Sequence, residues 1–122
     1  MGYKMNSNIS ELLGINEEHS TPDIPVFEKS LPKDVWGVAK MDRTIEVNSK
    51  LNKKDIAKVV RHEKEHVIQM RKGLVSYDNK NVYYRKHPLK QFLIFPRNKI
   101  KTGSHSLPWE KDVYNKTGEY PS

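Results

Sequence analysis

The feature of this sequence that most constrains its fold is one long amphipathic helix, predicted over residues 53–72. Apolar residues recur there at the helical period, which is typical of a helix with one face against a core. Asn52 is a suitable N-cap, and Asp55 follows it as in a variant of the capping box. Gly73 comes after two basic residues and is typical of a helix end. The other elements must therefore cover the apolar face of this helix.

Two strands are predicted just before the long helix. Residues 35–41 and 44–48 have the pattern of a hairpin that turns at Asp42–Arg43. In the second strand Ile45 and Val47 alternate with polar residues. This alternation predicts one buried face and one hydrated face.

Two more strands and a short helix are predicted after the long helix. The strands are expected at 81–85 and 91–95. Pro108 suits the first turn of a helix and Gly118 its end, so a helix is expected at about 108–116. The whole pattern predicts an α+β fold with a hairpin, a long helix, a second hairpin and a short C-terminal helix.

The first part of the chain differs from the rest. We expect an extended N-terminal arm at 1–34, followed by one domain at 35–122. The segment STPDIPVFEKSLP holds three prolines, which favour extended chain. The sequence does not decide whether this arm lies across the domain, docks on a partner or is loose. A chain of 122 residues suits a single modest core.

Composition excludes several kinds of site and partner. The chain has no cysteine, so disulfides, thiolate metal sites and a cysteine nucleophile are ruled out. The formal net charge is +7, but the basic residues are spread along the chain, so we do not expect nucleic acid to be the main partner. No secretory signal and no run suited to a membrane helix is visible, so we expect no membrane partner and a location in the cytoplasm or in a phage virion.

Three polar residues interrupt the apolar side of the long helix. A helical projection places Glu63 in the centre of the apolar arc, with His62 and His66 at its edge. A carboxylate in an apolar interface costs several kcal/mol unless it is compensated. Two histidines four residues apart project from one side of a helix and can bind one ion. The string His62-Glu63-Lys64-Glu65-His66 is H-E-x-x-H, and it predicts a divalent cation, zinc, beside Glu63.

A zinc site on this helix needs a third protein ligand, and a catalytic site leaves a fourth position for water. The downstream residues with suitable side chains are Asp78, His87, His105, Glu110 and Asp112. Glu110 is the preferred ligand, because it lies in a short helix that can pack against the long one, and His105 is the second choice. Whether His105 or Asp112 joins the site is open. Gln69, one turn beyond His66, could contact substrate, order the ligands or lie on the surface.

A strand pair, the HEKEH helix and a second helix that carries a glutamate together resemble the minimal core of gluzincin-type zincins, which are zinc metallopeptidases. The segments HEKEHVIQMRKG, YDNKNVYYR and LPWEKDVYNK are also similar to small HExxH proteins of bacteria and phages. The resemblance implies that His62, His66 and Glu110 bind zinc. It also implies that Glu63 acts as the general base.

The function expected from this resemblance is that of a zinc-dependent, peptidase-like hydrolase acting on a peptide or protein. A strand edge within 35–48 is expected to pair with extended substrate. The donor that stabilises the transition state is left open among Tyr83, Tyr84, Tyr114 and His105. The alternative is a non-catalytic, zinc-stabilised structural or binding protein, such as a phage virion or assembly component that holds its partner through the N-terminal arm.

Overall fold

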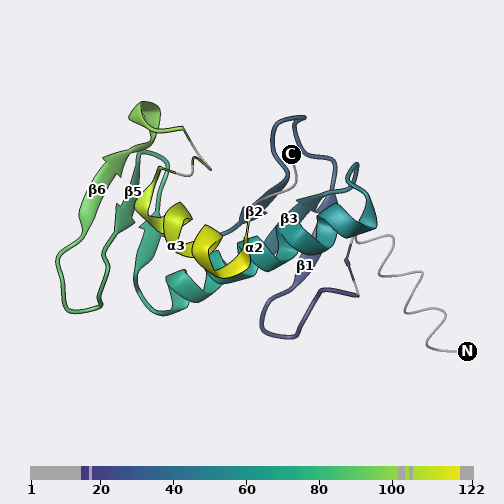
Figure 1. Ribbon diagram of the computed structural model, residues 1–122, viewed down its shortest axis with the longest axis horizontal. Helices are drawn as coiled ribbons and strands as arrows, with labels where there is room; N and C mark the ends of the chain where they lie inside the picture. Colours follow the sequence, from purple (N-terminus) through teal and green to yellow (C-terminus); the bar gives the residue numbers. More distant parts are fainter. Residues whose placement is uncertain (1–14, 17, 102–103, 105, 119–122) are drawn as a thin grey trace, which may run out of the picture.

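The computed structural model describes residues 15–16, 18–101, 104 and 106–118 of the chain. Two small sheets lie toward opposite ends of one long helix, and a shorter helix packs beside it (Figure 1). The fold is therefore α+β, as predicted. Within the described residues the elements are β1 (Val26–Lys29), β2 (Gly37–Ala39), β3 (Ile45–Asn48), α2 (Lys53–Arg71), β4 (Val75–Tyr77), β5 (Asn81–Tyr84), β6 (Leu93–Pro96), the 3₁₀ helix η1 (Arg97–Lys99) and α3 (Pro108–Thr117).

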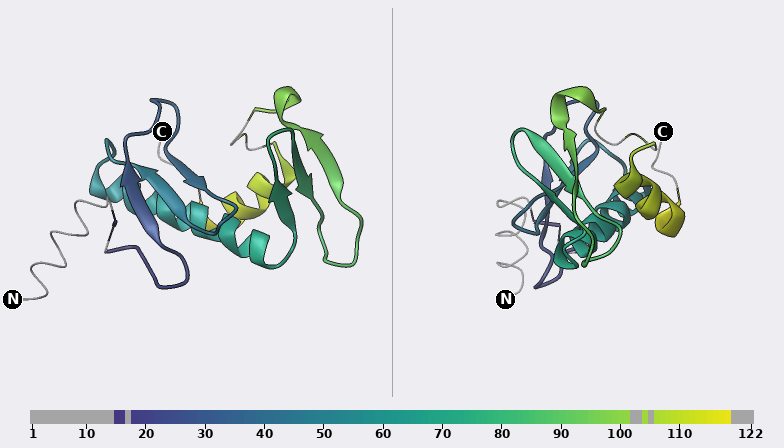
Figure 2. Two further views of the ribbon diagram at one scale, coloured as in Figure 1. Left: turned by 180° about the vertical axis from the view of Figure 1, so that it is seen from behind. Right: turned by 90° about the vertical axis from the view of Figure 1, so that its left-hand side faces the viewer.

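The first sheet has the strand order β1-β3-β2 and lies against α2 (Figure 2). β2 and β3 form the predicted antiparallel hairpin, although both strands are shorter than 35–41 and 44–48. The third strand, β1, pairs with β3 in parallel and comes from the region expected to be an extended arm. Val26 of β1 is fully buried. This part of the chain therefore lies across the domain and completes its core.

Helix α2 begins and ends close to the predicted positions. The Asn52 side chain accepts a hydrogen bond from the Asp55 amide at 2.9 Å, which caps the first turn. The helix ends at Arg71, and Gly73 follows with a φ of 71°, a left-handed value that glycine adopts easily because it has no Cβ. The apolar face of α2 and the first sheet share a core of Ile24, Val26, Ala39, Ile45, Val47, Ile56, Val59, Val60 and Val67.

The second sheet has the strand order β4-β5-β6. β5 and β6 form the second predicted hairpin, with β6 beginning later than the expected 91–95. β4 is an additional strand, which pairs with β5 across a tight turn. Asp78 caps this turn, since its Oδ1 accepts a hydrogen bond from the Asn81 amide at 2.7 Å.

Helix α3 confirms the predicted C-terminal helix. It starts at Pro108, and Gly118 at its end has a φ of 80°. A second core joins α3 and its entry to the second sheet, and it is formed by Val75, Tyr84, Leu107 and Trp109. Because α3 also contacts α2, its first turn places Glu110 against that helix. No helix of the described ranges is long and apolar enough to cross a membrane.

Candidate metal centre

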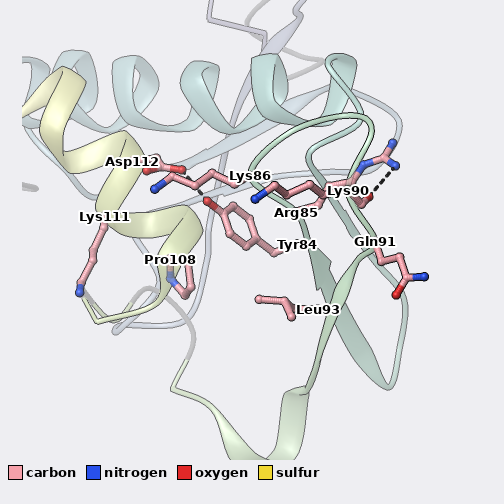
Figure 3. Close-up of a pocket in the computed structure, with 9 residues that line it drawn as sticks. All are labelled: Tyr84, Arg85, Lys86, Lys90, Gln91, Leu93, Pro108, Lys111 and Asp112. Atoms are coloured by element: carbon pink, nitrogen blue, oxygen red, sulfur yellow. Dashed lines mark hydrogen bonds between the residues drawn. The ribbon is translucent and has the colours of Figure 1, made fainter.

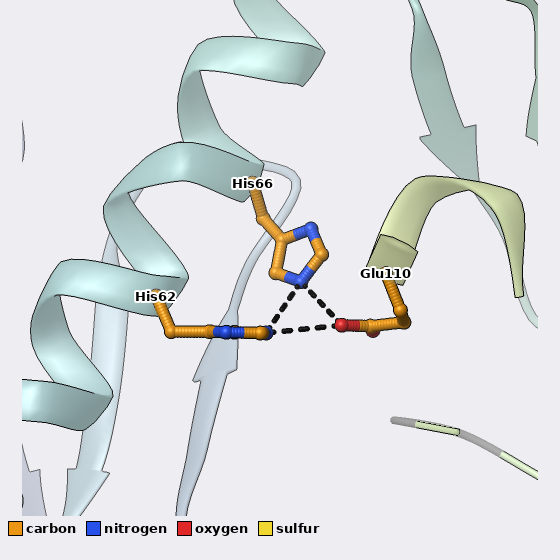
Figure 4. Close-up of side chains that lie close together, drawn as sticks. All are labelled: His62, His66 and Glu110. Carbon is orange, nitrogen blue, oxygen red and sulfur yellow. Dashed lines mark hydrogen bonds and ion pairs between the residues drawn. The ribbon is translucent and has the colours of Figure 1, made fainter. Parts of the chain in front are cut away.

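Three buried side chains from two helices, here called the triad, meet at one point. His62 and His66 lie one turn apart on α2, and Glu110 lies in the first turn of α3 (Figure 4). The Glu110 Oε1 atom is 3.0 Å from Nε2 of each histidine, and the two Nε2 atoms are 3.1 Å apart. The three residues are 2%, 7% and 6% exposed. The structure thus brings these residues together in a nearly equilateral triangle of ligand atoms inside the protein.

This triangle has the size of one face of a tetrahedral metal site. Zinc bonds to nitrogen and oxygen of about 2.0–2.1 Å place tetrahedral ligand atoms about 3.3 Å apart. Hydrogen bonds alone do not satisfy the triangle, because an ionised carboxylate carries no hydrogen and each Nε2 carries at most one. Two hydrogens would then have to serve three contacts. A cation accepts a lone pair from all three atoms at once, so the group could hold a metal ion.

The charges around the triad also favour a bound cation. Burial on its own would raise the pKa of Glu110, but hydrogen bonds from His62 and His66 lower this pKa to about 2. Burial on its own would lower the pKa of His66, but the hydrogen bond to Glu110 and the charge of Glu63 help raise it to about 9. In the metal-free protein a proton on His66 therefore takes the place that a cation would fill.

Gln69 determines which nitrogen of His66 faces the triangle. The Gln69 Nε2 donates a hydrogen bond of 3.0 Å to the Trp109 carbonyl, and this contact orients the amide with Oε1 toward His66. The His66 Nδ1 lies 2.8 Å from that Oε1 and must carry a hydrogen to donate to it. The lone pair of neutral His66 therefore lies on Nε2, which faces His62 and Glu110. Of the roles left open for Gln69, its contacts support ordering the ligands.

Glu63 lies on α2 directly after the first histidine of the triad and is only 5% exposed. Burial raises the pKa of its carboxyl group, and the charges of His66 and His62 partly oppose this rise. A carboxylate with a raised pKa is a stronger base than one in water. The environment of Glu63 therefore suits a group that accepts a proton.

Strand β2 brings an outer backbone edge next to Glu63. Its hydrogen bonds to β3 alternate so that Gly37 and Ala39 turn their amide and carbonyl groups away from β3. The Ala39 backbone lies near enough to the Glu63 carboxylate to lower its pKa slightly, and the Ala39 carbonyl accepts a hydrogen bond from the Tyr77 hydroxyl at 2.9 Å. A Cβ at Gly37 would collide with Val59 Cγ1 and lie 3.2 Å from Glu63 Cγ. The strand can approach the helix this closely because the residue is glycine.

The other downstream candidates lie away from the triad. Asp112 accepts a hydrogen bond from the Tyr84 hydroxyl at 2.9 Å. Asp78 caps the β4–β5 turn, and His87 accepts a hydrogen bond from a loop amide at 3.2 Å. His105 is outside the described residues. Within those residues, the triad is the one group of histidines and carboxylates with the spacing of a metal site.

Of the candidate transition-state donors that the structure describes, Tyr114 is the one that contacts the triad. Its ring centre lies 4.7 Å from that of His62, one turn of α3 beyond Glu110. Tyr83 and Tyr84 instead donate their hydroxyl hydrogens to carboxylates outside the triad.

Two residues near the site are not singled out by the sequence. A glycine inside a predicted strand often marks a close approach of the backbone, so Gly37 carried a signal that could have been used. Tyr77 carried none, because the carbonyl that it contacts is 38 residues away in the chain.

No protein-family model, curated protein or solved structure matches this chain. What the structure shows is a buried His-His-Glu group that could bind a metal ion.

Proposed function

We propose that this protein is a zinc-dependent, peptidase-like hydrolase in which Glu63 is the general base. The observation that supports this best is the triad, whose ligand atoms are 3.0–3.1 Å apart, with a buried carboxylate beside it. A structural zinc site usually has four protein ligands, whereas the described part of the chain supplies the three of the triad. This ligand number suits a site in which water or substrate takes the fourth position.

His62, His66 and Glu110 would hold the metal, and zinc bound there would polarise a carbonyl group and lower the pKa of water to roughly 7. The Glu63 carboxylate accepts a proton from the attacking water and later passes it to the leaving nitrogen. Gln69 keeps the Nδ1 hydrogen of His66 in place, so that Nε2 remains available as a ligand.

An extended peptide is the substrate that fits the outer edge of β2. A peptide strand can pair with an exposed sheet edge through backbone hydrogen bonds. The Ala39 carbonyl already accepts a hydrogen bond from the Tyr77 hydroxyl. The amide and carbonyl of Gly37 would therefore form the hydrogen bonds to the peptide strand. Because Gly37 lies against the Glu63 side chain, a peptide on this edge would pass beside the general base.

Metal content tests whether the triad binds zinc. The purified protein should contain stoichiometric zinc by mass spectrometry, and a Glu110→Ala variant should lose most of it. Asp112→Asn is the matched control, because it alters a carboxylate of the same helix that lies outside the triad. Equal zinc in the parent and in Glu110→Ala would refute the assignment of the third ligand.

Hydrolysis of an unfolded protein substrate tests whether Glu63 is the general base. A zinc-loaded Glu63→Gln variant should lose at least ~100-fold in rate while it keeps its zinc, because general-base catalysis contributes about 10²–10⁴-fold. Glu65→Gln makes the same chemical change on the same helix at a residue that pairs with Lys116, and it should leave the rate unchanged. Full activity of Glu63→Gln would sink the general-base role.

The second candidate function is a non-catalytic, zinc-stabilised structural or binding protein. It is favoured by the position of Glu110, which links α3 to α2 through its contact with His62. Helix α3 also packs on the second sheet. A metal there would hold the two ends of the molecule together. Zinc-dependent folding without hydrolysis of any peptide by the parent would favour this function over the first.

A further inference from the structure

A groove with a basic lining lies between α3 and the second sheet (Figure 3). Its walls come from the end of β5, the start of β6 with the loop before it, and the first turn of α3. Its volume is about 480 Å³, which is large enough for several side chains of a bound molecule. The lining residues that matter are Arg85, Lys86, Lys90, Leu93, Pro108 and Lys111.

The four cations of this groove form no ion pair in the part of the chain that the structure describes, and Asp112 is the single carboxylate among the lining residues. Arg85 is held in place, because its Nε donates to the Gly73 carbonyl at 2.7 Å and its guanidinium lies 4.2 Å from the centre of the Phe92 ring. Asp112, a carboxylate of the groove, already accepts the hydroxyl of Tyr84. The excess of positive charge favours an anionic ligand.

The β6 wall favours a peptide over nucleic acid. β6 is an outer strand, and none of the described helices and strands covers its free edge in Figures 1 and 2. The Arg97 amide donates to the Lys80 carbonyl at 2.8 Å, and the alternation along this ladder turns the amide and carbonyl of Ile94 outward. Leu93, which also lines the groove, is 58% exposed. An extended peptide can use both the backbone edge and this apolar side chain, whereas the sugar-phosphate backbone of nucleic acid has no amides with which to pair.

We propose that this groove binds an extended acidic segment of a protein partner. The segment pairs with the outer edge of β6 and places its carboxylates among Arg85, Lys86, Lys90 and Lys111. The interaction does not depend on hydrolysis at the metal centre, because no residue of the triad lines the groove.

Fluorescence anisotropy with the full chain tests this interaction. The probe is a labelled peptide of alternating glutamate and valine, compared with its glutamine analogue and with a labelled oligothymidine. The test variant carries Lys86→Gln, Lys90→Gln and Lys111→Gln, all at exposed side chains. The matched control carries Lys53→Gln, Lys54→Gln and Lys58→Gln, which remove the same charge from exposed positions at the start of α2.

The acidic peptide should bind the parent, and the groove variant should weaken binding about tenfold, since three exposed ion pairs are lost. The control variant and the glutamine analogue distinguish a specific site from non-specific attraction between the basic protein and the acidic peptide. The control variant should bind the acidic peptide as tightly as the parent does. The glutamine analogue should not bind the parent. Ile94→Pro, which removes the outward amide, should weaken binding severalfold. Absence of binding, equal losses in both lysine variants, or tighter binding of oligothymidine than of the peptide would each overturn the proposal.

Discussion

Replacing Gln69 with leucine should weaken zinc binding about 10–100-fold, as is typical for partners that orient a metal-ligating histidine. The substitution removes two hydrogen bonds, one of 2.8 Å with His66 Nδ1 and one of 3.0 Å with the Trp109 carbonyl. The proton of His66 is then no longer tied to Nδ1 and can occupy Nε2, the atom that faces His62 and Glu110. A loss of 10–100-fold corresponds to about 1.4–2.7 kcal/mol of binding free energy.

The same variant should also lose folding stability, because the buried Trp109 carbonyl and His66 Nδ1 are left without their partner. Two net hydrogen-bond contributions of about 0.5–1.5 kcal/mol each predict a loss of about 1–3 kcal/mol in the free energy of unfolding. Chemical denaturation of the metal-free protein measures this quantity.

Gln69→Glu separates the effect on the metal from the effect on stability. Glutamate keeps an acceptor for His66 but loses the donor to Trp109, so zinc affinity should stay near that of the parent while stability falls. Calorimetric titration with zinc gives the affinity, and ¹⁵N NMR of the imidazoles reports the tautomer of His66. If Gln69→Leu binds zinc as tightly as the parent and His66 keeps its hydrogen on Nδ1, the ordering role of Gln69 is wrong.

Four further predictions concern the proton on His66, the glycine of β2 and the cap of α2. The pKa of His66 in the metal-free protein is about 9, so zinc must displace a proton from this residue. The apparent zinc affinity, measured by calorimetry, should therefore rise about tenfold per pH unit from 6.5 to 9 and then level off. An affinity that does not change with pH would contradict this. The stability that the raised pKa gives the metal-free protein is present below pH 6.5 and lost as pH rises through 9, which thermal melts should show. Gly37→Ala should lower the melting temperature, because the new Cβ meets Val59 Cγ1, and an unchanged melt would mean that β2 can move away without cost. Asn52→Ala should cost about 1 kcal/mol in urea denaturation by removing the cap on the Asp55 amide, and no loss would show that the cap is dispensable.

The long helix and its polar face could be predicted because the signals for them are local. The helical period, the Asn52 cap and Gly73 all act within a turn or two of the residues they affect. The same period places Glu63 among apolar neighbours, whatever the rest of the chain does. Glu110 could be chosen from the residue types and from the helix signal of Pro108.

The remaining features depend on contacts between distant parts of the chain. β1 pairs in parallel with β3, and no turn signal links the two strands as it does in a hairpin. Prolines around Val26–Lys29 therefore favoured an arm over a strand of the sheet. Gln69 meets the Trp109 carbonyl across 40 residues, and only the packing of α3 on α2 brings them together.

The division of the triad between α2 and α3 has a further consequence for a chain without cysteine. His66 and Glu110 are 44 residues apart, so a metal held by both closes a loop of that length. By the loop-entropy relation used for disulfides, such a closure disfavours the unfolded chain by about 4 kcal/mol. A metal ion at this position would thus act as a reversible cross-link, which chelation opens and free metal restores, in a protein that has no thiols to form a permanent one.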